Sequence, residues 1–226
     1  PEKIEKGFNA NTVEQLFNFD PVAMLGMPAY TEAIAPSLAY VDGKLVIASN
    51  GPTPIYLNAK TGVKEGTVNL GSAEAYSVTN DEGKYILYCN HANGGETFKI
   101  WRSTGVDVAP ELYHSFTNTT SLPMGAKMKV NGSLDGDALI VITNEGIAGV
   151  TESGMITVVE VKGGSIVNTS VVDLSGVGTW GEAPVNIGTV VAASTDMADG
   201  WFTSQYEPSS DGSRVTVHSV LQSHQI

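Results

Sequence analysis

The stretch SLAYVDGKLVIASN, residues 37–50, carries the pattern that decides the fold. A short apolar run is followed by the polar pair Asp42-Gly43, then by a second apolar run that closes at Asn50. Asp-Gly between two apolar runs is a strong β-hairpin signal, because a tight turn needs positive φ angles that glycine adopts without steric cost. We therefore predict an antiparallel hairpin here, with a positive φ at Gly43.

The same pattern recurs three more times along the chain, at residues 76–90, 128–144 and 187–205. Each copy has an apolar strand, a polar turn with a glycine, a second apolar strand and an amide residue. The turn glycines of these copies are Gly83, Gly136 and Gly200. Asp135-Gly136 repeats the Asp-Gly signal, so we expect a tight turn with positive φ there as well.

A second hairpin is expected after each of the first three copies. Residues 54–62 lead into 63–70, residues 97–105 lead into 111–116, and residues 155–164 lead into 165–174. Within these runs apolar and polar residues alternate in places with a period of two, which is typical of strands with one buried face. The fourth unit begins its third strand at residues 214–220, shortly before the sequence ends.

Four antiparallel strands per unit, repeated every roughly 40 to 60 residues, is the pattern of β-propeller blades. We therefore predict an all-β, propeller-like array of four-stranded antiparallel blades, with about four repeats at residues 31–72, 73–119, 120–178 and 179–226. A β-sandwich also contains many short strands and is the alternative. The propeller is favoured because the turn, the amide and the Thr-Gly corner recur in the same order.

The blade count does not follow from the repeats alone. Residues 1–30 form an N-terminal segment that could supply an outer strand or pair with the incomplete fourth unit to close the ring. Closure of that kind would protect sheet edges from aggregation. Because the sequence stops within or just past a third strand, we favour a fragment of a larger propeller.

Composition supports strands and argues against several partners. Only 16% of the 226 residues are charged and 25 are glycine, while the formal net charge is −12. An acidic field of this size repels a phosphate backbone, so nucleic acid is not an expected partner. No apolar run approaches the roughly 18 residues of a transmembrane helix. The single cysteine, Cys89, lies in an apolar run and is expected to be a small buried hydrophobe.

Recurring polar residues point to one face of the expected propeller. The loop that leads into the innermost strand and the loop between the second and third strands open on the same face, beside the central axis. The second-to-third loops carry amides, and the 90–95 loop adds a histidine: Asn50, Asn90, His91, Asn93, Asn144 and Gln205. The leading loops carry Glu32, Glu74 and Glu182, each followed by alanine, whereas the third unit has SLPMG at residues 121–125 instead.

These residues allow two interpretations. Carboxylates and amides around a channel mouth can hydrogen-bond sugar hydroxyls or supply oxygen ligands to calcium, and Trp180, His91 and Tyr76 would add flat surface for a sugar ring. The alternative is structural: repeated Asn and Glu cap strand ends and join neighbouring blades. Repetition in every blade is what the structural interpretation predicts.

Signals for catalysis are sparse. The four histidines show no metal-ligand spacing, and no nucleophile elbow, Walker loop or dinucleotide-binding motif is present. Glu32, Glu74 and Glu182 could in principle include a carboxylate pair for glycoside hydrolysis, but a sequence does not give their separation. We assign no catalytic residue and no metal ligand, and a non-catalytic role is favoured.

The run NDEGKYILYCNHA (80–92), followed by TFKIWRST (97–104) and VAPELY (108–113), resembles uncharacterised propeller-like proteins of gut Bacteroidetes. LPMG (122–125) and LDGDA (134–138) fit the same family, and the resemblance covers about residues 35–200. It implies an exported protein, anchored by a lipid at the cell surface and near systems that capture glycans. The signal peptide and lipidated cysteine of such proteins are expected to lie outside this sequence.

These observations lead us to expect a non-catalytic, extracytoplasmic binding module, located at the cell surface or in the periplasm. Its expected ligand is a glycan or another surface protein, with calcium as the one candidate cofactor. A propeller-fold hydrolase or lyase that acts on carbohydrate through top-face carboxylates is one alternative. A structural or assembly module is the other.

Overall fold

The computed structural model describes residues 17–18, 21–26, 37–81, 84–144, 155–173, 179–180, 183–184, 201–208 and 215–222, the strands after residue 173 by their backbone alone. These residues form an all-β structure with three four-stranded antiparallel sheets, together with one short helix, α1 (Pro21–Met24). The prediction of an all-β chain built from four-stranded antiparallel units is confirmed for these three sheets.

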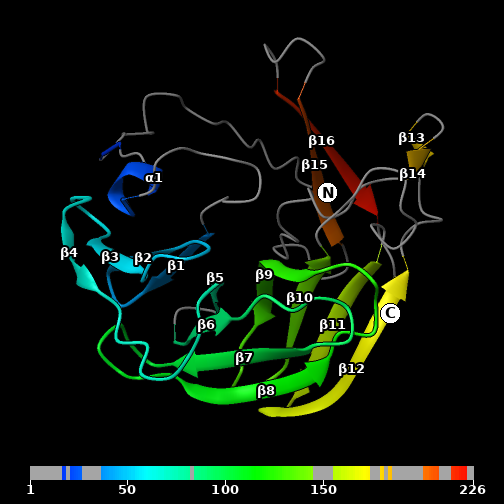
Figure 1. Ribbon diagram of the computed structural model, residues 1–226, viewed down its shortest axis with the longest axis horizontal. Helices are drawn as coiled ribbons and strands as arrows, with labels where there is room; N and C mark the ends of the chain where they lie inside the picture. The colour runs from blue at the N-terminus through cyan, green and yellow to red at the C-terminus, as the bar shows by residue number, and fades with distance from the viewer. Residues whose placement is uncertain are drawn as a thin grey trace, which may run out of the picture.

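Each sheet is a meander in which consecutive strands pair (Figure 1). Sheet 1 contains β1 (Ser37–Val41), β2 (Lys44–Ala48), β3 (Ile55–Asn58) and β4 (Lys64–Thr67). Sheet 2 contains β5 (Ser77–Asn80), β6 (Ile86–Cys89), β7 (Thr97–Ser103) and β8 (Glu111–Thr117). Sheet 3 contains β9 (Met124–Gly132), β10 (Ala138–Asn144), β11 (Met155–Lys162) and β12 (Ser165–Asp173).

Two pairs of strands follow sheet 3. β13 (Thr179–Trp180) pairs with β14 (Ala183–Pro184), and β15 (Trp201–Pro208) pairs with β16 (Val215–Gln222). The second pair falls where the sequence predicts the second and third strands of a fourth unit. The first strand expected for that unit, and the turn at Gly200, lie outside the described residues.

The first hairpin has the predicted turn. Val41 pairs with Lys44, so Asp42 and Gly43 alone form the loop, with φ angles of 42° and 73°. Positive φ at both loop residues matches the twist of the flanking strands, which is why Asp-Gly is favoured here. The positive φ predicted at Gly43 is confirmed.

The turn predicted at Gly136 is wrong in its geometry. Ala138 pairs with Gly132, which leaves residues 133–137 as a longer loop. The positive φ of 89° belongs to Gly132 at the end of β9, and Gly136 is not among the residues with positive φ. The Gly136 amide donates to the Ser133 carbonyl at 3.0 Å, so Gly136 occupies the last position of a turn, where any residue fits.

The core lies between sheets stacked face to face, with sheet 2 in the middle (Figure 1). Along β6, Ile86 and Tyr88 face sheet 1, whereas Leu87 and Cys89 face sheet 3, and all four are fully buried. A strand buried on both faces needs no polar alternation, which explains the apolar run ILYC.

The first strands of successive sheets lie side by side, β1 against β5 and β5 against β9. Side chains link them. Ser37 Oγ accepts a hydrogen bond from the Val78 amide at 2.8 Å, and Asn80 Oδ1 accepts one from the Tyr40 amide at 2.8 Å. Ser77, which like Ser37 is the first residue of its strand, donates to the Gly125 carbonyl at 2.6 Å. These bonds satisfy backbone groups on strand edges that would otherwise be open.

Replacing Gly43 with alanine should lower the free energy of unfolding by about 1 kcal/mol or more, because an L-residue is strained at this φ. A Cβ at Gly43 would meet no atom within 4 Å, so the loss would come from the backbone alone. Denaturant titration measures the effect. Gly136→Ala is the matched control: its Cβ would meet only the Ser133 carbonyl oxygen, at 3.9 Å, and its stability should stay within about 0.5 kcal/mol of the parent. Equal losses in the two variants would contradict the turn assignment.

Candidate functional site

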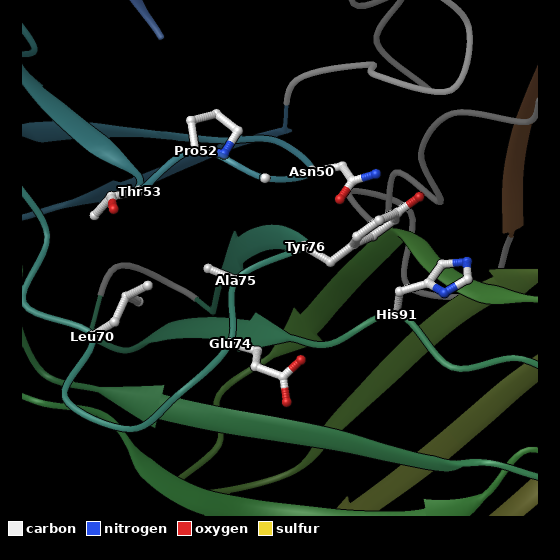
Figure 2. Close-up of a pocket in the computed structure, with 9 residues that line it drawn as sticks. Asn50, Pro52, Thr53, Leu70, Glu74, Ala75, Tyr76 and His91 are labelled. Atoms are coloured by element: carbon white, nitrogen blue, oxygen red, sulfur yellow. The ribbon is translucent and has the colours of Figure 1, made fainter.

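A cleft of about 450 Å³ opens where loops of sheets 1 and 2 meet, which we call the first junction (Figure 2). Three segments line it: the β2–β3 loop, the connection from β4 to β5, and the first part of the β6–β7 loop. These are the two kinds of loop that the sequence analysis placed on one face. The lining residues are Asn50, Gly51, Pro52, Thr53, Leu70, Glu74, Ala75, Tyr76 and His91.

The connection from β4 to β5 is held at both ends. Near its start, the Asn69 amide nitrogen donates to the Val106 carbonyl at 2.9 Å, and its side-chain Nδ2 donates to the Asp107 carbonyl at 3.2 Å. At its end, the Tyr76 amide donates to the Cys89 carbonyl at 2.7 Å. Glu74 therefore sits on a segment that sheet 2 fixes in place.

Tyr76 and His91 form an aromatic pair in the cleft. Ser77 pairs with Cys89 in the sheet, so the residue before β5 and the residues after β6 are neighbours. The two rings lie with centroids 4.8 Å apart and planes tilted by 48°, and both residues are half-buried. Figure 2 shows the two rings side by side, with the Asn50 amide close to them. The pair gives the cleft an apolar surface beside hydrogen-bonding groups.

Asn50 and Glu74 supply those groups. Both are exposed, and in the view of Figure 2 they lie on opposite sides of Tyr76. Thr53 is also exposed and adds a hydroxyl. An amide, a carboxylate and a hydroxyl can together donate and accept hydrogen bonds from a polar ligand.

Two other candidate asparagines are used inside the protein. Asn90 is buried, its Nδ2 donates to the Thr97 carbonyl at 3.0 Å, and its Oδ1 accepts from the Lys99 amide at 2.7 Å. Asn144 is 1% exposed and donates to Thr120 Oγ1 at 3.0 Å. Their amides hold loops together rather than facing the cleft.

Asn93 lies in an exposed turn away from the cleft lining. Its backbone amide and its Nδ2 both donate to Glu96 Oε2, at 2.8 and 3.1 Å. Among the remaining candidates, Glu32 and Glu182 lie outside the described residues. Trp180 and Gln205 fall in β13 and β15, where the structure describes the backbone and not the side chains.

At the junction between sheets 2 and 3, which we call the second junction, the described loops are bonded directly to each other. Ala92 and Met124 form an isolated antiparallel bridge with both N–O distances at 3.0 Å. Asn118, which is fully buried, donates to the Ala92 carbonyl at 3.1 Å and to the Leu122 carbonyl at 2.8 Å. Gly125 allows this closure, because a Cβ there would lie 2.4 Å from the Asn90 carbonyl oxygen. The third unit departs from the Glu-Ala pattern at the place where the chain closes the second junction.

Four lining residues were not singled out from the sequence: Gly51, Pro52, Thr53 and Leu70. Gly51, Pro52 and Thr53 directly follow Asn50, so extending the candidate set along that loop would have included them. Leu70 carries no signal of its own, because an apolar residue near a strand end is ordinary.

Among the described residues, the titratable groups outside the cleft do not form a second candidate site. Burial raises the pKa of the Cys89 thiol to about 11, although its contact with Ser77 acts in the other direction, so this cysteine behaves as a core residue. Burial lowers the pKa of His114, whose Nε2 lies 2.9 Å from Thr169 Oγ1. Within the described ranges, no group of three or more His, Cys, Asp or Glu side chains is placed to hold a metal ion. No helix in this part of the chain has the length and apolar character to cross a bilayer.

Replacing Asn118 with alanine should lower the free energy of unfolding by about 2 kcal/mol or more, because two buried carbonyl groups lose their donor. Asn50→Ala should change it by less than about 0.5 kcal/mol, since Asn50 is exposed. Thermal and denaturant unfolding of the two variants measures this difference in the free energy of unfolding between a residue that joins sheets, Asn118, and one that does not, Asn50. A large loss for Asn50→Ala would assign it a structural role instead.

Comparison with protein families matches residues 15–224, nearly the whole chain, to a family described as "Domain of unknown function (DUF8500)". A crystal structure of a DUF4623 family protein from Bacteroides eggerthii is similar, with a TM-score of 0.57 and 16% sequence identity. The similarity covers 85% of this chain and 44% of that protein, so this chain spans less than half of its length. At this identity the similarity concerns the fold alone. The source organism of that structure, Bacteroides eggerthii, agrees with the resemblance to Bacteroidetes proteins noted from the sequence.

Comparison with curated proteins finds no match. The family assignment therefore rests on the match over residues 15–224. This chain belongs to the family described as Domain of unknown function (DUF8500).

Proposed function

We propose that this chain is a carbohydrate-binding module and that its ligand occupies the cleft at the first junction. The observation that carries the proposal is the Tyr76–His91 ring pair beside the exposed Asn50 and Glu74 in one cleft. Sugar rings offer apolar faces that pack on aromatic side chains and hydroxyls that both donate and accept hydrogen bonds. The cleft volume of about 450 Å³ lies within the usual range of small-molecule sites, about 300–1,000 Å³.

The contrast between the two junctions supports a ligand site over a purely structural role. At the second junction the polar residues are buried and bonded to the protein, as Asn118 and Asn144 are. At the first junction Asn50 and Glu74 occupy equivalent loops yet are exposed at a cleft. Polar residues that join sheets are buried and hydrogen-bonded to the protein. Asn50 and Glu74 are exposed instead, which favours a role in binding a ligand.

The composition of the cleft supports binding without hydrolysis. Glu74 is the one carboxylate among the nine lining residues that belong to the described part of the chain. Most glycoside hydrolases use two carboxyl groups, about 5 to 9.5 Å apart. A single carboxylate with an amide and two rings is sufficient to hold a sugar.

We further propose that the three sheets are consecutive blades of a β-propeller. The meander order of each sheet, the adjacency of β1, β5 and β9, and the burial of sheet 2 on both faces support this arrangement. A β-sandwich instead pairs two sheets over one core, usually through Greek-key connections. In a propeller the cleft would open beside the central axis.

The proposal also places the module outside the cytoplasm, where a bacterial cell meets glycans. The resemblance to exported Bacteroidetes proteins supports this location. Fractionation of cells that produce the protein from its native gene would test this location. Recovery of the protein in the cytoplasmic fraction would contradict the location but would not contradict the proposed binding.

Titration calorimetry after a glycan-array screen tests the proposed binding. We expect Tyr76→Ala to weaken binding of the best saccharide about tenfold, because it removes an aromatic surface worth about 1–1.5 kcal/mol, and Asn50→Ala to weaken it by a similar factor. Asn93→Ala is the matched control: Asn93 lies on the same β6–β7 loop as His91 but is not among the lining residues, so the variant should bind like the parent. Absence of any saccharide hit, or an equal loss in the Asn93 variant, would contradict the proposal.

A further inference from the structure

The charges around the cleft are unevenly distributed. Among the residues that the structure describes, nine line the cleft; they include one carboxylate, Glu74, and neither lysine nor arginine. The whole sequence carries a formal net charge of −12, so the surrounding field has the same sign as Glu74. An anionic ligand would therefore meet repulsion from Glu74 and would find neither a lysine nor an arginine partner among the described lining residues.

The ion pairs of sheets 1 and 2 lie away from the cleft. Lys44, which pairs with Glu65, begins β2, whereas Asn50 follows the other end of that strand. Arg102, which pairs with Glu111 at 2.8 Å, lies near the end of β7, while the loop that carries His91 precedes its start. Each of these cations is neutralised by a carboxylate of its own at the opposite end of the sheet.

Lys99, near the start of β7, is the cation to consider on the cleft side of sheet 2. Its Nζ lies 5.9 Å from the centroid of the Trp101 ring, and Trp101 belongs to the core between sheets 1 and 2. Lys99 is not among the residues that line the cleft. The carboxylate of Glu74 is therefore the charge that a bound ligand meets first.

A carboxylate discriminates among sugars in a defined way. Its two oxygens accept hydrogen bonds and donate none, so they favour neighbouring hydroxyls on a neutral ring. A second anion about 4 Å away is repelled by a factor of about five in water, and by more where water is partly excluded. Added salt weakens such repulsion, whereas it leaves a steric mismatch unchanged.

We infer that the cleft selects saccharides without carboxylate or sulfate groups, and that Glu74 is the residue that sets this preference. The inference rests on the proposed carbohydrate-binding function and names the substrate class of the same site. Uronic acids and sulfated sugars of matching shape bind more weakly than neutral or basic sugars.

The test uses pairs of probes that differ in one group. Neutral oligosaccharides of glucose, galactose and mannose are each compared with the form oxidised to a uronate at C6, at pH 8, which is above the ordinary pKa of about 6.5 for free histidine. We expect the parent to bind the neutral member at least about fivefold more tightly, and Glu74→Gln to reduce the difference to less than about twofold. High salt should narrow the difference for the parent and leave it unchanged for Glu74→Gln.

Glu111→Gln is the control, because Glu111 is exposed at the end of sheet 2 opposite the cleft, and it should keep the parental preference. Equal or tighter binding of the uronate by the parent, or an unchanged preference in Glu74→Gln, would overturn the inference. If such uronate binding is lost in Tyr76→Ala, the proposed function stands and the inference alone fails. If the parent binds neither member of any pair, the proposed function fails and the inference with it.

Discussion

The burial of sheet 2 on both faces is the constraint on which the rest of the structure depends. Ile86 and Tyr88 pack toward sheet 1, and Leu87 and Cys89 pack toward sheet 3, so four consecutive residues of β6 join two separate cores. Each large apolar side chain buried in this way contributes about 1.5–3 kcal/mol relative to exposure. Stacked sheets lie about 10 Å apart, which brings the loops at their ends close enough to form a cleft or to seal against one another.

The two junctions show what those loops can do from the same starting geometry. At the second junction, SLPMG at residues 121–125 replaces the Glu-Ala pair, Met124 bridges to Ala92, and Asn118 donates hydrogen bonds to the Ala92 and Leu122 carbonyls. At the first junction, the Asn50 loop and the Glu74 connection stay apart, and the Tyr76–His91 pair lines the gap between them. The polar residues of the repeat are hydrogen-bonded within the protein at the second junction and exposed at the first. This difference supports a ligand site at the first junction.

Much of the fold could be predicted because its signals are local. Asp42-Gly43 between apolar runs specifies a hairpin through residues that are adjacent in the chain, and the order of turns and amides shows the four-stranded units. The sequence also indicated the loops that meet at the cleft, and Asn50, Glu74, Tyr76 and His91 lie together there.

The features that could not be predicted depend on partners that are distant in the sequence. The links of Ser37 to Val78 and of Ser77 to Gly125 join different sheets, and no local pattern marks these serines. The internal bonds of Asn90 and Asn144 likewise arise from packing, so sequence spacing alone could not separate them from Asn50.

Backbone NMR of the labelled protein, titrated with the best-binding neutral oligosaccharide, tests most directly whether the first junction is the ligand site. The account predicts that the backbone amide signals of residues 50, 51, 53, 70–76 and 91 shift on titration. The amide signals of residues 118–122 and 124, at the second junction, should stay in place. Shifts centred on the second junction, or spread evenly over the three sheets, would contradict it.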